Sequence, residues 1–264
     1  GQDRDSVSIA TKVTGRNSEG WFGPNSMRLS YDRIRSAIKN SLARLCTDYI
    51  DVFFLHWPDR YTNNFGRKYY NPDPDPNFVG FDEQFDALVD AQKAGEINAI
   101  GFANETPWGL MRFIELNRKV QLTIHVQDAF SLINRNIELA MKEIILRENL
   151  QFQAHSVLAG GLLSGKYEVK NGDFIGRGRI STLKYETRKL REQQILEKYD
   201  VIKMYAIQNN TDVYKLATSF VSSQAFVNEI ILGASTIKQL EVVVNGILQP
   251  INREIIDKLG IQVK

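Results

Sequence analysis

Short apolar runs recur along the chain and predict a set of β-strands. Most of these runs are nearly continuous in aliphatic and aromatic residues instead of alternating with polar ones. Such continuity is typical of parallel strands that are covered on both faces. The predicted strands are 7–12 (VSIATK), 49–57 (YIDVFFLHW), 98–104 (NAIGFAN), 122–127 (LTIHVQ), 150–156 (LQFQAHS) and 229–235 (EIILGAS).

Segments with apolar residues at helical spacing separate these runs. Ser30 and Thr106 are typical N-cap residues, and Pro107 is favoured at a first helical position. Strict alternation of strand and helix predicts a parallel sheet with helices outside it. No linker composition interrupts the chain, so we predict a single domain over 1–264. The helical segments lie around 34–45, 81–89, 107–114, 195–206, 213–220, 240–244 and 255–259.

Unusual residues gather at the predicted strand ends. They are Lys12, His56, Trp57, Asn104, Gln127, His155, Ser156 and Ser235. In a (β/α)8 TIM barrel this carboxyl-terminal face carries the active site. A doubly wound sheet would place a glycine-rich turn after its first strand, and the turn VTGRNSEG has no G-x-G-x-x-G. The pattern therefore favours a barrel, although about six βα units are visible where eight are needed.

Composition excludes several classes of function. Lys and Arg total 33 against 31 Asp and Glu, so no global charge attracts nucleic acid or an anionic membrane. No apolar run reaches the ~20 residues of a membrane span. The polar opening GQDRDSVS is not expected to be a signal peptide. Cys46 is the single cysteine, which excludes an internal disulfide and an all-cysteine metal site, and no metal is predicted. Cytoplasm is the expected compartment.

The stretch LAGGLLSGKY, 158–167, contains part of a P-loop pattern. Gly160 to Lys166 fits G-x-x-x-x-G-K, but Tyr167 stands where a Ser or Thr hydroxyl would bind Mg²⁺. A phenol is a poor ligand for this small octahedral ion. The stretch therefore does not predict a nucleotide triphosphatase, and binding of a phosphate of another kind is left open by this pattern alone.

Six ordered motifs resemble the aldo-keto reductases over nearly the whole chain. They are IATKV, LARLCTDYIDVFFLHWPDR, GEINAIGFANETPWG, HVQDAFSLINR, LAGGLLSGKY and ILGASTIKQLE. The long HWPDRYTNNFG loop resembles the branch that includes relatives of channel β-subunits. The resemblance implies a (β/α)8 barrel that binds NADP(H) and reduces aldehydes or ketones.

The family's catalytic group is a tetrad of Asp, Tyr, Lys and His. By resemblance, Lys12 is the tetrad Lys and His56 the tetrad His. The Asp and Tyr belong to two βα units that precede the first predicted strand, so ~60 residues are expected to be missing from the amino-terminal side. Lys12 is expected to lower the pKa of the Tyr phenol, and His56 to bind the carbonyl oxygen.

The resemblance also assigns cofactor and substrate contacts. Asn104 and Gln127 are expected at the nicotinamide carboxamide, and His155 against the nicotinamide ring. Ser156, Leu158, Gly160 and Lys166 are expected at the pyrophosphate, and Arg177 or Arg179 is expected to close over it, with a solvated basic turn as the alternative. Ser235 and Gln239 are expected at the 2′-phosphate and adenosine, and Trp21 and Trp57 in the substrate pocket. His125 is expected to point elsewhere along its strand and to be structural.

Some positions depart from the family pattern and keep an alternative open. Ala103 replaces a serine, and Val242 and Val243 replace a polar pair that holds adenine. These changes favour a catalytically inactive relative that binds NADP(H) or a protein partner in a regulatory role. An unrelated barrel enzyme, such as a phosphate-sugar lyase, would need a paired acid and base at strand ends, and the sequence shows none. A protein partner or an oligomer is left open.

Overall fold

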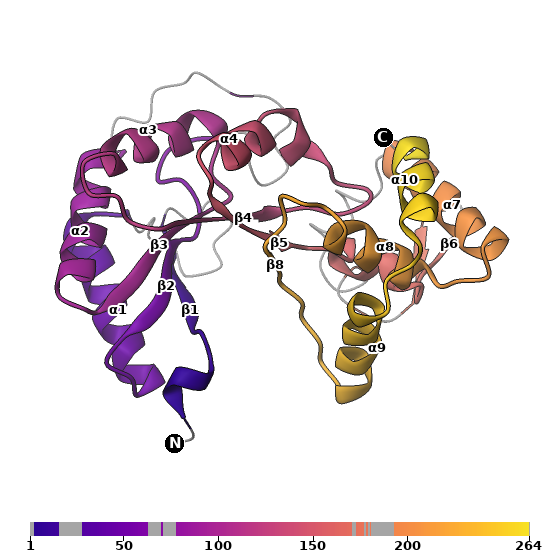
Figure 1. The fold of residues 1–264 in the computed structure, drawn as a ribbon, viewed down its shortest axis with the longest axis horizontal. Helices are drawn as coiled ribbons and strands as arrows, with labels where there is room; N and C mark the ends of the chain where they lie inside the picture. The colour runs from indigo at the N-terminus through magenta and orange to yellow at the C-terminus, as the bar shows by residue number, and fades with distance from the viewer. Residues whose placement is uncertain are drawn as a thin grey trace. The chain divides into compact units, whose positions relative to one another are not determined.

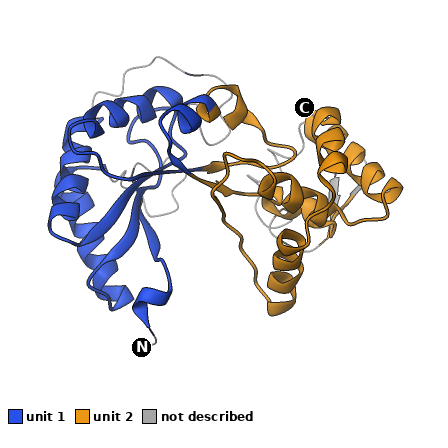
Figure 2. Cartoon of the chain, viewed as in Figure 1, with its two compact units in different colours: residues 1–127, 143–151 blue, residues 128–142, 152–264 orange. Residues whose placement is uncertain are grey.

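The chain folds into parallel strands connected by helices, in two compact units. The computed structural model describes residues 3–15, 28–62, 70, 78–170, 173–176, 178, 180 and 193–263. The first unit comprises 1–127 and 143–151, and the second unit comprises 128–142 and 152–264 (Figure 2). The single domain over 1–264 stays a prediction, and each unit is described by itself.

The first unit is built on strands β1 to β4. β1 pairs with β2, β2 with β3 and β3 with β4, and all three pairs are parallel. Helices α1, α2 and α3 lie along one side of these strands (Figure 1). The elements, in chain order, are β1 (Ala10–Val13), α1 (Tyr31–Leu45), β2 (Ile50–Leu55), α2 (Phe81–Lys93), β3 (Ile97–Ala103), α3 (Pro107–Asn117) and β4 (Ile124–Ala129), after a 3-10 turn at Arg4–Ser6. α4 (Met141–Arg147) crosses the boundary between the units.

The predicted caps begin two of these helices. The Ser30 side chain accepts from the Arg33 backbone N–H at α1, and the Thr106 side chain accepts from the Gly109 N–H at α3. Pro107 takes the first position of α3, where its missing N–H would have no helical partner. These helices therefore begin where the sequence predicted.

The second unit contains two parallel strands, a hairpin and four longer helices among its described residues. β5 pairs in parallel with β8, and β6 pairs with β7 in an antiparallel hairpin that the sequence did not predict. β8 is shorter than the predicted 229–235 strand. The elements are β5 (Gln151–His155), β6 (Glu168–Lys170), β7 (Asp173–Ile175), α7 (Gln193–Gln208), α8 (Val213–Ser222), β8 (Glu229–Ile230), α9 (Ile237–Leu248) and α10 (Arg253–Gln262), with 3-10 turns at Asn136–Leu139 and Ala159–Ser164.

The strands of the first unit present two different faces. Phe102 belongs to the face that meets the helices, because its ring stacks on Phe113 of α3 at a centroid distance of 4.1 Å. The opposite face carries a small buried cluster of Val52, Phe54, Ala99 and Ala103. This α/β arrangement is consistent with part of a (β/α)8 barrel, in which the second face would line the interior.

Gly101, in the middle of β3, occupies a position where a side chain does not fit. A Cβ at this position would lie 2.2, 2.3 and 2.7 Å from atoms of the Phe54 ring. The two residues are partners in the β2–β3 register, so the strands cannot separate to relieve the clash. The glycine therefore allows the ring to lie against the backbone of the neighbouring strand.

We predict that Gly101→Ala lowers the free energy of unfolding by about 1–3 kcal/mol, as expected for overpacking a core. Urea unfolding of the purified variant measures the change. Gly233→Ala is the matched control, because a Cβ at Gly233 meets nothing within 4 Å. Equal stability of the two variants would contradict the packing described.

Candidate functional site

The first unit brings four predicted site residues to the carboxyl ends of neighbouring strands. Lys12 lies in β1, His56 follows β2, Asn104 follows β3, and Gln127 lies in β4. The His56 backbone N–H donates to the Val13 carbonyl at 3.0 Å, and the Asn104 backbone N–H donates to the Gln127 carbonyl at 2.9 Å. The parallel register therefore gathers these residues at adjacent strand ends.

Asn104 connects two of these strand ends through its side chain. Its φ of 54° lies in the left-handed region, where asparagine is better tolerated than most residues. From this backbone its Nδ2 donates to the His56 carbonyl at 2.9 Å. The amide therefore fixes the backbone that carries the imidazole.

Lys12 presents a half-buried ammonium beside the Phe54 ring. The distance from Nζ to the ring centroid is 5.1 Å, which is within the range of a cation–π contact. Burial lowers the pKa of Lys12 from its ordinary value of 10.5. The charge is therefore less well solvated than that of a surface lysine, which strengthens its action on a nearby group.

His56 is held in its neutral form. Burial and, to a smaller extent, the positive charge of Lys12 lower the pKa of His56 from 6.5 to about 4. A neutral imidazole has one N–H donor and one acceptor nitrogen. Around neutral pH His56 can therefore donate to an oxygen without carrying a charge of its own.

We predict that the protein loses stability in acid because of His56. The unfolded chain takes up this proton near pH 6.5 and the folded chain only near pH 4, so the free energy of unfolding falls as pH decreases between these values. Allowing for the partial exposure of the ring, the loss from about pH 7.5 to about pH 5 is ~1–2 kcal/mol. Urea unfolding at both pH values measures it. In His56→Gln the loss should be ~1 kcal/mol smaller, and an unchanged loss would show that other groups cause it.

Trp57 contacts His56 directly. The two rings are 4.3 Å apart between centroids and tilted by 37°, and Trp57 is only 7% exposed. Most of the indole surface is therefore covered by protein. Its role in a substrate pocket stays a prediction.

Asp59, which is not among the predicted site residues, holds two chain segments in place through hydrogen bonds. It is 1% exposed, and its carboxylate accepts from the backbone N–H groups of Leu29 at 2.8 Å and Val79 at 2.9 Å. Charged backbone hydrogen bonds of this kind compensate the burial of a carboxylate. Asp59 therefore connects the HWPDR stretch to the residues before α1 and α2.

Arg60 makes a second buried connection. Its guanidinium donates to both Glu105 carboxylate oxygens, at 2.6 and 3.2 Å, and to the Thr106 hydroxyl at 2.8 Å. It also lies 5.1 Å from the Phe81 ring centroid and 5.0 Å from that of Trp108. The loop after β2 is thus fixed to the start of α3. The sequence signal that points to Asp59 and Arg60 is their position, since they directly follow His56, Trp57 and Pro58.

The second unit carries the predicted pyrophosphate loop after β5. Ser156, Ala159, Gly160 and Gly161 all have positive φ, from 48° to 101°. His155 Nδ1 lies 2.9 Å from the Ser156 hydroxyl oxygen. Leu158 is at the centre of the turn, where its carbonyl accepts from the Gly161 N–H at 2.9 Å. The Ala159 N–H donates to the Ser156 carbonyl at 2.7 Å, and Gly160 and Gly161 carry no side chains, so a ligand can approach the backbone of this turn closely.

Lys166 lies between two glycine-containing segments. A Cβ at Gly161 would lie 3.4 Å from its Nζ, and a Cβ at Gly178 would lie 2.7 Å from it. Beside it, Tyr167 is 1% exposed, and its phenol oxygen accepts from the Ile180 N–H at 3.2 Å. Tyr167 is therefore a packing residue, and Lys166 is followed by the β6–β7 hairpin and not by the helix that follows a P-loop.

Ser235 and Gln239 lie at the start of α9. The Ser235 backbone N–H donates to Gln239 Oε1 at 2.9 Å, and the Gln239 N–H donates to the N-cap hydroxyl of Thr236 at 3.2 Å. Both residues are exposed. Val243, on the same helix, is 7% exposed and packs in the interior of this unit, so it offers a ligand little surface.

The expectation that His125 points elsewhere along its strand was wrong, whereas its structural role stays a prediction. Its ring meets the Phe54 ring edge-on at a centroid distance of 6.4 Å, so it points to the same face as Phe54. In the register Gly101 pairs with His125 and Ala103 with Gln127, two residues further along β4. Because side chains two apart share a face, His125 and Gln127 point to the same side.

Three predicted residues, Trp21, Arg177 and Arg179, lie outside the described residues. The part of the chain that the structure describes contains no cluster of three or more His, Cys, Asp and Glu side chains suited to a metal ion. Within the same described ranges, no helix has both the length and the apolar character to cross a membrane.

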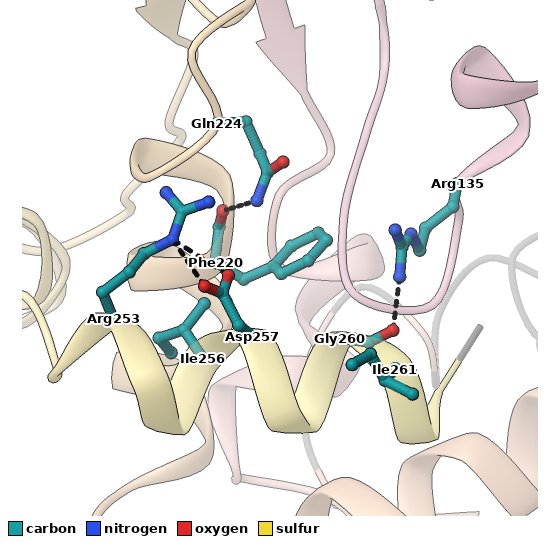
Figure 3. A pocket seen from close by; sticks show the side chains of 8 residues that line it. All are labelled: Arg135, Phe220, Gln224, Arg253, Ile256, Asp257, Gly260 and Ile261. Atoms are coloured by element: carbon teal, nitrogen blue, oxygen red, sulfur yellow. Dashed lines mark hydrogen bonds and ion pairs between the residues drawn. The ribbon is translucent and has the colours of Figure 1, made fainter.

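The second unit also contains a cavity of about 300 Å³ beside α8 and α10 (Figure 3). Arg135 lines it and donates to the Gly260 carbonyl at 2.6 Å, while Arg253 donates to Asp257 at 2.9 Å. The Arg135 guanidinium also lies over the Phe220 ring. Arg135 thus attaches the end of α10, the Arg253–Asp257 pair lies within α10 itself, and none of the predicted site residues lines the cavity.

Comparison with known proteins shows one family over almost the whole chain. The model described as "Aldo/keto reductase family" matches residues 1–260. Protein tas of Escherichia coli (strain K12) is 33% identical over 263 residues, which are 97% of this chain and 74% of that protein. An aldo-keto reductase of Babesia bovis is 34% identical over 251 residues, covering 89% of this chain and 87% of that protein. The L-glyceraldehyde 3-phosphate reductase of Escherichia coli (strain K12) is 25% identical over 244 residues, covering 90% and 64%.

Proposed function

Because the chain belongs to the aldo/keto reductase family, we propose that it reduces aldehydes or ketones to alcohols with NADP(H). The members of this family are oxidoreductases that usually depend on NAD(P)H. The observation that carries the proposal is that four predicted site residues lie at adjacent strand ends: Lys12, His56, Asn104 and Gln127.

His56 and Lys12 act on the carbonyl oxygen in this proposal. The neutral imidazole donates an N–H to that oxygen and orients the carbonyl group. The half-buried ammonium of Lys12 stabilises the negative charge that develops on the oxygen as the carbon is reduced. In the family the proton comes from a tyrosine, and the reaction is measured with the full-length protein.

The residues present fit a dinucleotide cofactor, whose reduced nicotinamide supplies the hydride when it is bound. The amides of Asn104 and Gln127 offer donors and acceptors that match a carboxamide. In the second unit, the left-handed turn at Gly160 and the cation of Lys166 suit a pyrophosphate. Ser235 and Gln239, at the start of α9, suit the 2′-phosphate of NADP(H).

We predict that Asn104→Asp lowers kcat/KM by ~10–100-fold, because a carboxylate cannot donate to the His56 carbonyl and would repel it. Steady-state reduction of an aldehyde measures the effect. Asn149→Asp is the matched control, since Asn149 also has a left-handed φ, of 50°, and is exposed. An equal loss of activity in both variants would show that Asn104 has no specific role in the reaction.

The direct test of the function is NADPH oxidation by the full-length protein with a panel of small aldehydes and ketones. The proposal expects turnover of some of them. Tight binding of NADPH without turnover of any of them would contradict it. That result would favour the second candidate, a regulatory relative without catalysis, which the departures at Ala103, Val242 and Val243 support.

A further inference from the structure

Four residues form a row of register partners across the sheet of the first unit, and its β2 member lies two residues before His56. Lys12 pairs with Phe54, Phe54 with Gly101, and Gly101 with His125. Since residues that pair across parallel strands point to the same face, the three side chains of this row lie on the face that carries His56. The row thus contains one predicted catalytic residue, Lys12, and three residues to which no role in the reaction is assigned.

The Phe54 ring is the centre of this row and is held from two sides. It lies against the backbone of Gly101, where a Cβ would be 2.2 Å from a ring atom. On β4 the His125 ring meets it edge-on, with 74° between the ring planes. The ring is 0% exposed. Its position is therefore fixed by packing.

The Lys12 ammonium lies over this fixed ring, 5.1 Å from its centroid. The negative face of an aromatic ring attracts a cation, most strongly where water is excluded. Among the described residues, no carboxylate forms an ion pair with Lys12; the titratable groups on the same face are His56, which is affected by the Lys12 charge, and His125. Within the described ranges, the ring is therefore the aromatic surface against which the ammonium lies.

We propose that Phe54 is a positioning residue for Lys12, and that Gly101 is a glycine so that the ring can serve as this support. The kinetic consequence of the proposal rests on the function proposed above for Lys12. The physical part, that the ring holds the ammonium, does not depend on turnover.

The test compares Phe54→Leu with Phe53→Leu in the full-length protein. Both remove a ring from β2 at positions 0% exposed, but Phe53 is on the opposite face. The pKa of Lys12 is followed by NMR in lysine labelled with ¹³C, with the signal identified through Lys12→Arg. Loss of the cation–π contact should lower this pKa by about 0.5–1 unit in Phe54→Leu and leave it unchanged in Phe53→Leu. No change, or a rise, in Phe54→Leu would overturn the proposal.

Kinetics then separate this proposal from the proposed function. If the protein is a reductase, Phe54→Leu should lower kcat by about 10-fold with KM within about twofold, because the ammonium is misplaced only relative to the reacting oxygen. Phe53→Leu should keep the wild-type kcat per folded molecule. An inactive wild-type protein would reject the function and leave the NMR titration as the decisive test of Phe54.

Discussion

Replacing Lys12 with methionine is expected to lower kcat of the full-length protein by about 10²–10⁴-fold. Methionine keeps a similar length and apolar character but has no charge. The half-buried ammonium beside His56 is placed to stabilise developing negative charge and to favour ionisation of a neighbouring phenol. Initial rates of aldehyde reduction at saturating NADPH measure the effect.

The Lys12→Met variant needs two controls. Lys39→Met, at an exposed position of α1, should keep the wild-type kcat. The Kd for NADPH should change by less than about threefold in Lys12→Met, because the lysine is assigned to the carbonyl oxygen and not to the phosphates. A variant with nearly full kcat would show that Lys12 is a structural residue.

Replacing Lys166 with methionine is expected to weaken NADPH binding by about 10–100-fold, the effect of losing a hydrogen bond from a charged donor to an anion. Its ammonium lies beside Gly161 and Gly178, next to the left-handed turn after β5. Titration of the cofactor by protein fluorescence measures the Kd. The dependence of this Kd on salt should also become weaker in the variant.

Lys170→Met is the matched control for Lys166→Met. Lys170 is the last residue of β6, four positions after Lys166, is 68% exposed and pairs only loosely with Glu168 at 3.5 Å. Its loss should change the Kd for NADPH by less than about twofold. If the two variants bind NADPH equally well, the assignment of Lys166 to the pyrophosphate is wrong.

The parts of the site that could be predicted follow from strand periodicity. Lys12, His56, Asn104 and Gln127 were predicted together because the carboxyl ends of parallel strands meet at one edge. The same rule places His125 on the side of Gln127, two residues away, contrary to the expectation for His125. The β6–β7 hairpin was not predicted because its three-residue strands carry too little pattern.

Contacts between distant side chains could not be predicted. Charged residues in a loop are usually exposed, yet Asp59 is buried because it accepts from two backbone N–H groups far from it in the sequence. The support of Lys12 by Phe54 likewise depends on the space that Gly101 leaves on the neighbouring strand. Such features depend on register and packing, which a single sequence specifies only indirectly.

Hydride transfer by this protein is the central claim, and isotope transfer tests it most directly. The full-length protein is incubated with an aldehyde and NADPH that carries deuterium on the nicotinamide carbon that donates hydride, and the alcohol is analysed by mass spectrometry. The account predicts an alcohol with one deuterium on the former carbonyl carbon, formed far more slowly by Lys12→Met. No labelled alcohol from the wild-type protein with any aldehyde or ketone, although NADPH binds, would contradict it.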